Sequence, residues 1–377
     1  RTPMRMRGTE GMAARGLLRS TFEGRALVNC PDATCSFHEY LFPPPSKKLP
    51  PLILHIKAPD RWGYEDGNRL TRLVGAACVL PLQYIEELIE FGAVYYSEHE
   101  SKKAKRVLSD VPVKRGSYCR VHVNPKRYLN TYTVDWSSRI VRQIDDLIAI
   151  DKPYGVPSQP LVDNLVECST FQVQQVLALP TIHVTSRIDV ATSGLQILAK
   201  TSEAAESFNK QVRSRSIRKE YLVCCEKELP LGPVRHLCLA RSHKKRKGRD
   251  FLLSRYREVF DPTVWAEAVL EILEKTRVEN NQDQKVGDCW QYRVRIISGR
   301  THQIRLQLAA LSSPVIGDTR YWDLAGVLVD DLGVDEPVTL GPDPERICLQ
   351  AAELEFEIDG RALVVKAGPP WWVAQEP

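Results

Sequence analysis

The sequence predicts an α+β protein with more than one domain, and three observations indicate this. The chain has 377 residues, well above the ~100–200 residues of a typical single domain. Its 43% hydrophobic and 26% charged residues are ordinary for globular chains, and no apolar run approaches the roughly 20 residues that span a bilayer. Short apolar segments typical of strands alternate with segments of helical periodicity.

The positive charge is modest in total but clustered. The net charge is +5, and the densest basic runs lie at residues 213–219 and 241–249. Clusters of this kind favour a polyanionic partner, most simply nucleic acid. A solvated basic loop is the alternative for either run taken alone.

The ten cysteines have no repeated spacing. Cys30, Cys35 and His38 come nearest to a metal site, but a structural zinc ion needs four ligands, so we expect none there. Cys224 and Cys225 are adjacent in a strand-like segment and are expected in the core. The absence of a disulfide framework favours a reducing compartment.

Residues 1–65 are predicted to form an irregular extension. The first twenty residues carry five arginines against one acid, Glu10, which is typical of organellar transit peptides. We therefore expect a mitochondrial protein, with the cytoplasm or another organelle as the alternative, and a disordered RNA-binding arm as the competing interpretation of the segment. The proline clusters at 43–45 and 50–51 argue against helices or central strands there.

Residues 66–128 are predicted to form a small separate domain. Two helices are expected from Arg69 and from Pro81, and strands at 93–96 and 118–123. This order, with Arg-Leu at 69–70, Leu-Ile-Glu-Phe-Gly-Ala-Val at 88–94 and Val-Lys-Arg-Gly at 113–116, resembles an S4 RNA-binding domain. The second helix carries Glu86, Glu87 and Glu90, which would repel phosphate, so this domain could instead pack on protein.

The main domain is expected over residues 138–374, after a polar linker at 124–138. Its expected strands and helices follow the apolar pattern of each segment. Strands are expected at 147–150, 195–199, 219–225, 354–358 and 362–366, helices at 170–179 and 203–213, and a strand–turn–helix unit at 291–311. Residues 230–290 are predicted to be an irregular insertion that contains one helix, at 264–275.

A lone acid, Asp189, stands out at the start of the buried strand 195–199. Its loop is closed by Thr192, Ser193 and Gly194. A charged side chain held by a turn at the end of a core strand is well placed for chemistry, because the scaffold fixes its direction. The alternative is an Asx-turn acid that only orders its own loop.

A basic turn follows strand 291–297. Arg300, His302 and Arg305 cluster where a helix begins, and cations there oppose the helix dipole. Such a cluster indicates either an anion site or a partner for a buried acid. Tyr221, near the start of another strand, would on its own be taken as an aromatic residue packed on a sheet.

Together these stretches resemble the RluA-type RNA pseudouridine synthases. The matching words are Arg-Ile-Asp-Val-Ala-Thr-Ser-Gly-Leu at 187–195, Lys-Glu-Tyr at 219–221 and Gly-Arg-Thr-His-Gln-Ile-Arg at 299–305. Asp-Lys-Pro-Tyr-Gly at 151–155 and Pro-Val-Ile-Gly-Asp at 314–318 fit the flanking words. Five words in the right order, over about residues 140–370, make the resemblance specific.

The resemblance implies a mixed, mainly antiparallel sheet core with flanking helices and a central RNA cleft. It also implies conversion of uridine to pseudouridine in RNA, most simply ribosomal RNA, without metal or organic cofactor. From the lack of a long apolar run we expect no membrane partner. Asp189 would be the nucleophile, Arg305 its partner and Tyr221 the residue that lines the pocket against uracil and takes the C5 proton. The expected substrate-binding residues are Arg187, which would fill the space left by the flipped base, with Thr192, Ser193, Gly194, Arg300, His302 and Gln303.

Two alternatives remain open. Ser186 stands where the family usually has histidine, which together with the acidic helix and the insertion motivates a catalytically silent RNA-binding factor in ribosome assembly, with ribosomal or assembly proteins as partners. A metal-dependent hydrolase using His302 and Asp318 lacks clustered ligands in the sequence.

Overall fold

The computed structural model describes residues 52–58, 68–78, 80–240, 252–278, 287–332 and 338–373. These residues form two compact units. The N-terminal unit comprises the described part of residues 1–127 together with Pro160–Glu167, and the C-terminal unit comprises Tyr128–Gln159 and the described residues from Cys168 onwards. Three earlier expectations lie outside the described residues: the Arg-rich end, the Cys30/Cys35/His38 group and the basic run at 241–249.

The N-terminal unit is a four-stranded antiparallel sheet with two helices. The expected helices and two expected strands are confirmed, and the strand order is β1-β4-β2-β3. The bounds are β1 Ile53–Lys57, α3 Leu70–Cys78, α4 Leu82–Glu90, β2 Val94–Ser97, β3 Lys105–Arg106 and β4 Tyr118–His122. Residues 1–65 were predicted to be irregular, and this was wrong for β1. The side chains of Leu54 and Ile56 point into the core at alternate positions, and the backbone of β1 pairs with β4.

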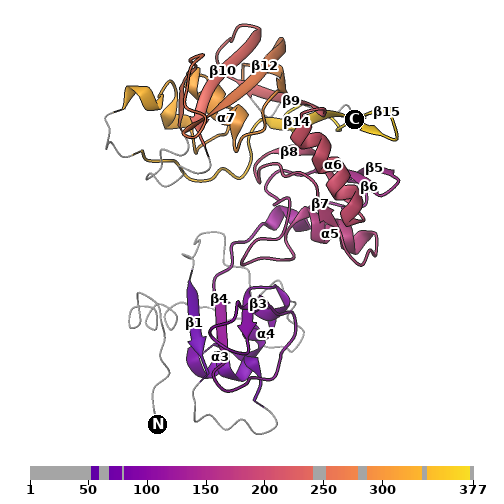
Figure 1. Ribbon diagram of the computed structural model, residues 1–377, viewed down its shortest axis with the longest axis vertical. Coiled ribbons are helices and arrows are strands. Elements are labelled where there is room, and N and C mark those ends of the chain that lie inside the picture. Colours follow the sequence, from indigo (N-terminus) through magenta and orange to yellow (C-terminus); the bar gives the residue numbers. More distant parts are fainter. Residues whose placement is uncertain are drawn as a thin grey trace. The chain divides into compact units, whose positions relative to one another are not determined.

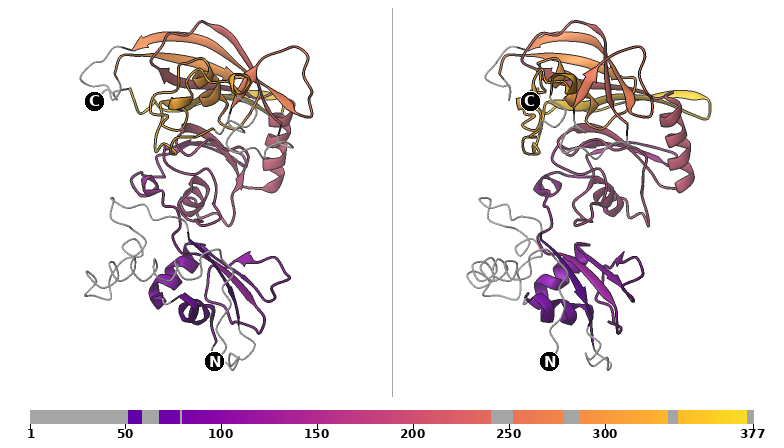
Figure 2. Two further views of the ribbon diagram at one scale, coloured as in Figure 1. Left: turned by 90° about the vertical axis from the view of Figure 1, so that its left-hand side faces the viewer. Right: turned by 60° about the vertical axis from the view of Figure 1, so that its left-hand side comes forward.

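Both helices of this unit cover the same face of its sheet (Figure 2). The core between them contains Leu73, Ile85 and Leu88 from the helices and Ile56 and Val121 from the strands. Because side chains alternate along a strand, the residues between these core positions point to the opposite face. Among the described residues, the helices therefore cover one face of this sheet and leave the other without a helix.

Pro160–Glu167 belongs to the N-terminal unit through buried polar contacts. The Glu167 side chain is fully buried and accepts hydrogen bonds from Nε and Nη2 of Arg127 at 2.9 and 2.5 Å. Asn164 donates to Glu167 Oε2 at 2.8 Å and to the Lys126 carbonyl at 2.8 Å. A buried carboxylate is stable only when paired in this way.

The C-terminal unit is built on one mixed, mainly antiparallel sheet of eleven strands, as expected (Figure 1). The path runs β11-β10-β12-β13-β9-β14-β8-β6-β5, with β15 on β14 and β7 on β8. The strands are β5 Ile140–Ile144, β6 Leu147–Lys152, β7 His183–Val184, β8 Ser193–Ala199, β9 Arg218–Cys225, β10 Gly232–Leu239, β11 Leu253–Arg255, β12 Trp265–Val278, β13 Cys289–Ile296, β14 Leu349–Ile358 and β15 Arg361–Lys366.

Three helices flank this sheet: α5 Ser169–Val176, α6 Ser202–Ser214 and α7 Gln303–Ala310. Short 3₁₀ turns lie at Leu129–Tyr132, Trp322–Leu324 and Val329–Asp331. The predicted polar linker at 124–138 also packs in part, because Trp136 is buried and donates its indole N–H to the Thr131 carbonyl at 2.8 Å. In the described part of the chain, no helix has both the length and the apolar character that a membrane span requires.

The predicted helix at 264–275 is instead strand β12, and the predicted irregular insertion is largely sheet. Ala268, Leu270 and Ile272 are buried at every second position, which is the period of a strand. The Ala, Glu and Leu content favours a helix locally, but pairing with β10 on one side and β13 on the other outweighs it. Residues 230–240 and 252–278 thus extend the central sheet.

Two parts of the sheet meet through a short parallel contact between β8 and β14. Gly194 faces Ala351 there, with φ of +102°. A Cβ at position 194 would lie 2.2 Å from the Ala351 carbonyl oxygen, so only glycine allows this approach. The glycine therefore joins the strand that follows the Asp189 loop to the rest of the sheet.

Candidate active site

The loop between β7 and β8 carries Asp189 and is held on both sides of it. Ser158 Oγ donates to the Ile188 carbonyl at 2.8 Å and accepts from the Ile188 N–H at 3.1 Å. The Gly155 N–H donates to the Val190 carbonyl at 2.7 Å. These contacts fix the backbone next to Asp189, whose side chain is 29% exposed.

The buried side chain of Lys152 also holds the Asp189 loop in place. Its side chain is fully buried, and Nζ donates to the carbonyls of Pro153 at 2.9 Å, Val156 at 2.7 Å and Val190 at 3.3 Å. Burial lowers the pKa of Lys152 to about 7, while the charges of Asp189 and Asp151 act in the opposite direction. Three carbonyl acceptors match the three N–H groups of an ammonium.

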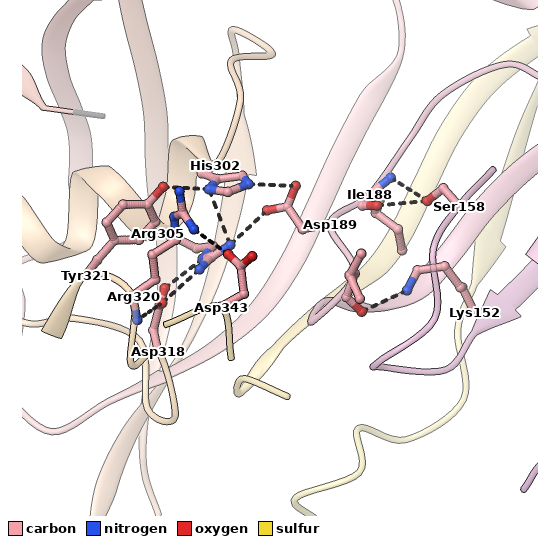
Figure 3. Close-up of polar contacts among 11 residues, drawn as sticks. Lys152, Ser158, Ile188, Asp189, His302, Arg305, Asp318, Arg320, Tyr321 and Asp343 are labelled. Atoms are coloured by element: carbon pink, nitrogen blue, oxygen red, sulfur yellow. Dashed lines mark hydrogen bonds and ion pairs between the residues drawn. The ribbon is translucent and has the colours of Figure 1, made fainter. Parts of the chain in front are cut away.

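The basic turn sits at the start of α7, opposite Asp189 (Figure 3). His302 adopts a left-handed conformation, with φ of +53°, immediately before the helix. The Gln303 side chain accepts from Ser298 Oγ at 3.1 Å and from the Arg300 N–H at 3.0 Å, and donates to the Val269 carbonyl at 2.8 Å. Gln303 therefore holds the turn in shape.

Arg305 lies between two carboxylates. Its Nε and Nη2 donate to Asp318 at 2.7 and 2.8 Å, and its Nη1 lies 3.6 Å from Asp189 Oδ2. The side chains of Arg305 and Asp318 are 3% and 0% exposed. Burial opposes the charge of Arg305, but the pair with Asp318 outweighs it, and the pKa of Arg305 is raised. Asp318 thus fixes a permanent cation beside Asp189.

His302 forms the second contact with Asp189. Its Nε2 lies 3.6 Å from Asp189 Oδ1, and its Nδ1 lies 2.6 Å from the Tyr321 hydroxyl. Burial lowers the pKa of His302 below its ordinary value, although Asp189 acts in the opposite direction. The imidazole is therefore neutral at neutral pH, and Arg305 supplies the positive charge that faces Asp189.

Tyr221 on β9 lines the same pocket as Asp189. Burial, reinforced by the charge of Asp189, raises the pKa of Tyr221 well above its ordinary value. Tyr221 is therefore a protonated phenol at neutral pH.

The pocket has about 390 Å³ of non-atom space, including solvent at its mouth. Eight of the ten residues expected to form the site line it: Arg187, Asp189, Thr192, Tyr221, Arg300, His302, Gln303 and Arg305. The elements that supply them are far apart in sequence, and the fold brings them together.

The remaining two residues have a different position. Ser193 and Gly194 do not line the pocket; Ser193 is buried at the start of β8, and Gly194 packs on β14. Both residues are buried in β8, and their expected contact with substrate stays a prediction. Arg187 is exposed at the mouth of the pocket.

Three residues of the site were not among the expected site residues, and the sequence considered only Asp318, as a metal ligand in the hydrolase alternative. They are Asp318 and Tyr321, which contact Arg305 and His302, and Lys152, which supports the loop. Asp318 and Lys152 belong to the flanking words at 314–318 and 151–155. The sequence did contain a signal for Asp318. It is a lone acid in the turn after α7, and the cations at the start of that helix could have suggested an ion pair.

Comparison with known proteins agrees with this geometry. Residues 146–310 match the family model described as RNA pseudouridylate synthase. The "RNA pseudouridine synthase 6, chloroplastic" of Oryza sativa subsp. japonica is 26% identical over 92% of this chain and 85% of its own length. "Ribosomal large subunit pseudouridine synthase D" of Xylella fastidiosa is 27% identical over 69% of this chain and 73% of its own length.

A solved structure described as "Human RNA Pseudouridylate Synthase Domain Containing 4" superposes with a TM-score of 0.44 at 19% identity, over 65% of this chain and 92% of that one. The matched family model covers both the Asp189 loop and the Arg305 turn. Residues 146–310 therefore carry an RNA pseudouridylate synthase domain, and the relatives support a pseudouridine synthase of the RluA type.

Proposed function

We propose that this protein converts uridine to pseudouridine in RNA, with Asp189 as the nucleophile. The observation that carries the proposal is the contact between Asp189 and Arg305 in a pocket shared with Tyr221. A carboxylate shut partly away from water stays ionised when a fixed cation lies beside it. Arg305, itself held by Asp318, is that cation.

The reaction exchanges one bond to the ribose for another. The Asp189 carboxylate attacks C1′ and the C1′–N1 bond breaks, so the electron pair leaves with uracil. The uracil rotates in the pocket, and C5 forms the new bond to C1′ as the carboxylate is released. The C5 proton is removed and N1 gains one, so the product is an isomer of the substrate. Removal of a ribose proton by Asp189, followed by elimination, is the other route open to this carboxylate.

Tyr221 would contact the uracil and handle the C5 proton. Because its phenol is protonated at neutral pH, it can accept that proton only while passing its own proton on, as a relay. Arg187 is exposed at the pocket mouth, where its side chain could occupy the space that the flipped nucleotide leaves.

The proposed substrate is ribosomal RNA in an organelle. The Xylella relative is named for the large ribosomal subunit, which supports this class of RNA. The Arg-rich first twenty residues support a mitochondrial address. The S4-like N-terminal unit would contribute RNA affinity. The competing proposal, a silent ribosome-assembly factor, is favoured by Ser186 at the usual histidine position.

Pseudouridine mapping tests the proposal. Organellar and cytosolic RNA would be mapped in cells that carry either wild-type protein or Asp189→Asn, and the protein would be located by fractionation. Loss of one or a few sites in organellar ribosomal RNA is expected. An unchanged map with a growth defect only on deletion would instead establish the assembly factor.

A further inference from the structure

The helix-free face of the N-terminal sheet carries a cluster of arginines and aromatic rings. The register places Arg120 opposite Tyr95, and Tyr95 opposite Arg106, so all three share one face. His55 lies opposite Arg120 on the other side and is flanked by Tyr118. We call these residues, with His122, the sheet-face cluster.

The rings and guanidinium groups of the cluster stack on one another. The Arg120 guanidinium carbon lies 4.3 Å from the Tyr95 ring centroid, and that of Arg106 lies 5.4 Å from it. His55 and Tyr118 stack with ring centroids 5.9 Å apart, and His55 Nδ1 lies 2.5 Å from the Tyr118 hydroxyl. The stacked groups thus extend across the four strands β1, β4, β2 and β3.

The two arginines of the cluster form no ion pair within the part of the chain that the structure describes, although Asp163, in the segment at 160–167, acts electrostatically on His122. No carboxylate there pairs with Arg120 or Arg106. Arg120 Nε is buried without a hydrogen-bond partner among these residues. Arg106 donates instead to the Tyr95 hydroxyl at 2.8 Å and to the Leu161 carbonyl, so the segment at 160–167 orients it without cancelling its charge.

The opposite face has the reverse character. Helix α4 presents Glu86 and Glu90 to solvent, while the outward positions of the strands hold no acid. An RNA strand is therefore repelled by the α4 side and attracted by the strand side. Aromatic rings and arginine planes on a protein surface stack unpaired bases, which have an exposed π-face that paired bases lack.

We propose that the sheet-face cluster binds unpaired RNA, with bases stacked on Tyr118, His55 and the Arg120 plane, and phosphates contacted by Arg106 and Arg120. This surface lies outside the Asp189 pocket and goes beyond the proposed catalysis. It supplies the protein with a second contact on the RNA, through the face of the N-terminal unit that carries no helices.

Binding of a labelled single-stranded RNA of about 12 nucleotides, within the site sizes of single-strand binders, tests the inference. Every protein would be full length and carry Asp189→Asn, so the readout is independent of turnover. Arg120→Gln is expected to weaken binding about tenfold and to reduce the salt slope by about 0.7, the loss of one phosphate contact on a single strand. A duplex of the same sequence should bind more weakly and respond less.

Arg72→Gln is the matched control, because it removes one exposed charge from α3 on the helix side of the same unit. Equal or greater weakening by Arg72→Gln would place RNA on the helices and overturn the proposal. No effect of either variant would also overturn it and leave the sheet face to a protein partner.

Ultraviolet crosslinking of the unsubstituted chain to the same RNA keeps the proposal testable if Arg120→Gln fails to fold. Crosslinks are expected on the peptides that contain Tyr95 and Tyr118, and crosslinks confined to the helices or the C-terminal unit would contradict it. RNA binding through this face in a protein that converts no uridine would refute the proposed catalysis alone. Conversion without binding here would refute the present inference alone.

Discussion

Arginines serve two different purposes in the two units. In the C-terminal unit, Arg305 is 3% exposed and lies between Asp318 and Asp189. In the N-terminal unit, Arg120 and Arg106 stack on Tyr95, with no carboxylate partner among the described residues. Arg305 is held in one position beside Asp189, whereas Arg120 and Arg106 form no ion pair among the described residues.

The difference follows from the cost of burying a charge. A guanidinium taken out of water must be paired and hydrogen-bonded, and a pair of this kind gives a rigid, permanently charged neighbour. A half-buried guanidinium on an aromatic ring keeps part of its hydration and can exchange it for phosphate or a base. Rigidity suits catalysis on one bond, and exchange suits binding of a flexible polyanion.

The largest expected effect is on the rigid region. Asp189→Asn should lower the rate of pseudouridine formation by at least ~10³-fold, because the amide cannot act as the nucleophile, while RNA binding changes little. Single-turnover assays on a transcript of the identified site, with binding measured in parallel, check this. Asp323→Asn, an exposed acid outside the pocket, serves as control. Retained activity in Asp189→Asn would remove Asp189 from the mechanism.

Asp318→Asn tests whether rigidity of Arg305 matters. We expect kcat to fall by about 10–100-fold with little change in RNA affinity, since Arg305 stays charged but loses its bidentate partner. The unfolding free energy should fall by about 3–5 kcal/mol, because a buried guanidinium is left with a poorer partner.

Asp343→Asn is the matched control, since Asp343 pairs with the neighbouring Arg320 but is 57% exposed. An exposed pair contributes at most about 1 kcal/mol, so its loss should be small. Equal effects of the two variants would show that burial of the partner is not what fixes Arg305.

Glu87→Gln tests a buried charge without a full set of partners in the N-terminal unit. It should raise the stability of the fold slightly, whereas Asp318→Asn should lower it. Glu87 is 6% exposed, and its Oε2 has no hydrogen-bond partner among the described residues. Burial, followed by the charge of Glu90, raises the pKa of Glu87 to about 7, although Arg127 acts in the opposite direction. This buried acid is therefore a cost to the fold when charged.

The pH dependence follows from the raised pKa. Between pH 4.5 and about 7 the folded state holds more protons at Glu87 than the unfolded chain, so stability falls as pH rises, and the cost is fully present above about 7. Glu87→Gln should raise Tm by a few degrees at pH 8 and by little at pH 5. Thermal melts at both pH values check this against Glu86→Gln on the exposed side of α4. A gain at pH 5 equal to that at pH 8 would contradict the titration of Glu87.

Local patterns in the sequence were sufficient for many elements. The starts of helices α3 and α4 and the bounds of α6, β6, β8 and β9 were expected close to where they are observed, because the apolar spacing of these segments agrees with their tertiary environment. The family motifs predicted that Asp189, Tyr221 and Arg305 share one site.

Other features depended on segments far apart in the chain. Residues 264–275 favour a helix by composition, yet two neighbouring strands make them β12. Asp318 became the partner of Arg305 only because the turn after α7 folds back onto that helix.

The distribution of charge between the two faces of the N-terminal sheet also depends on how segments far apart in the chain pack together. The sequence by itself indicated the family, the candidate reacting residues and the locally consistent elements. The tertiary structure alone decided which charges are paired, because hydrogen bonds and ion pairs across the fold join residues whose spacing in the chain carries no signal.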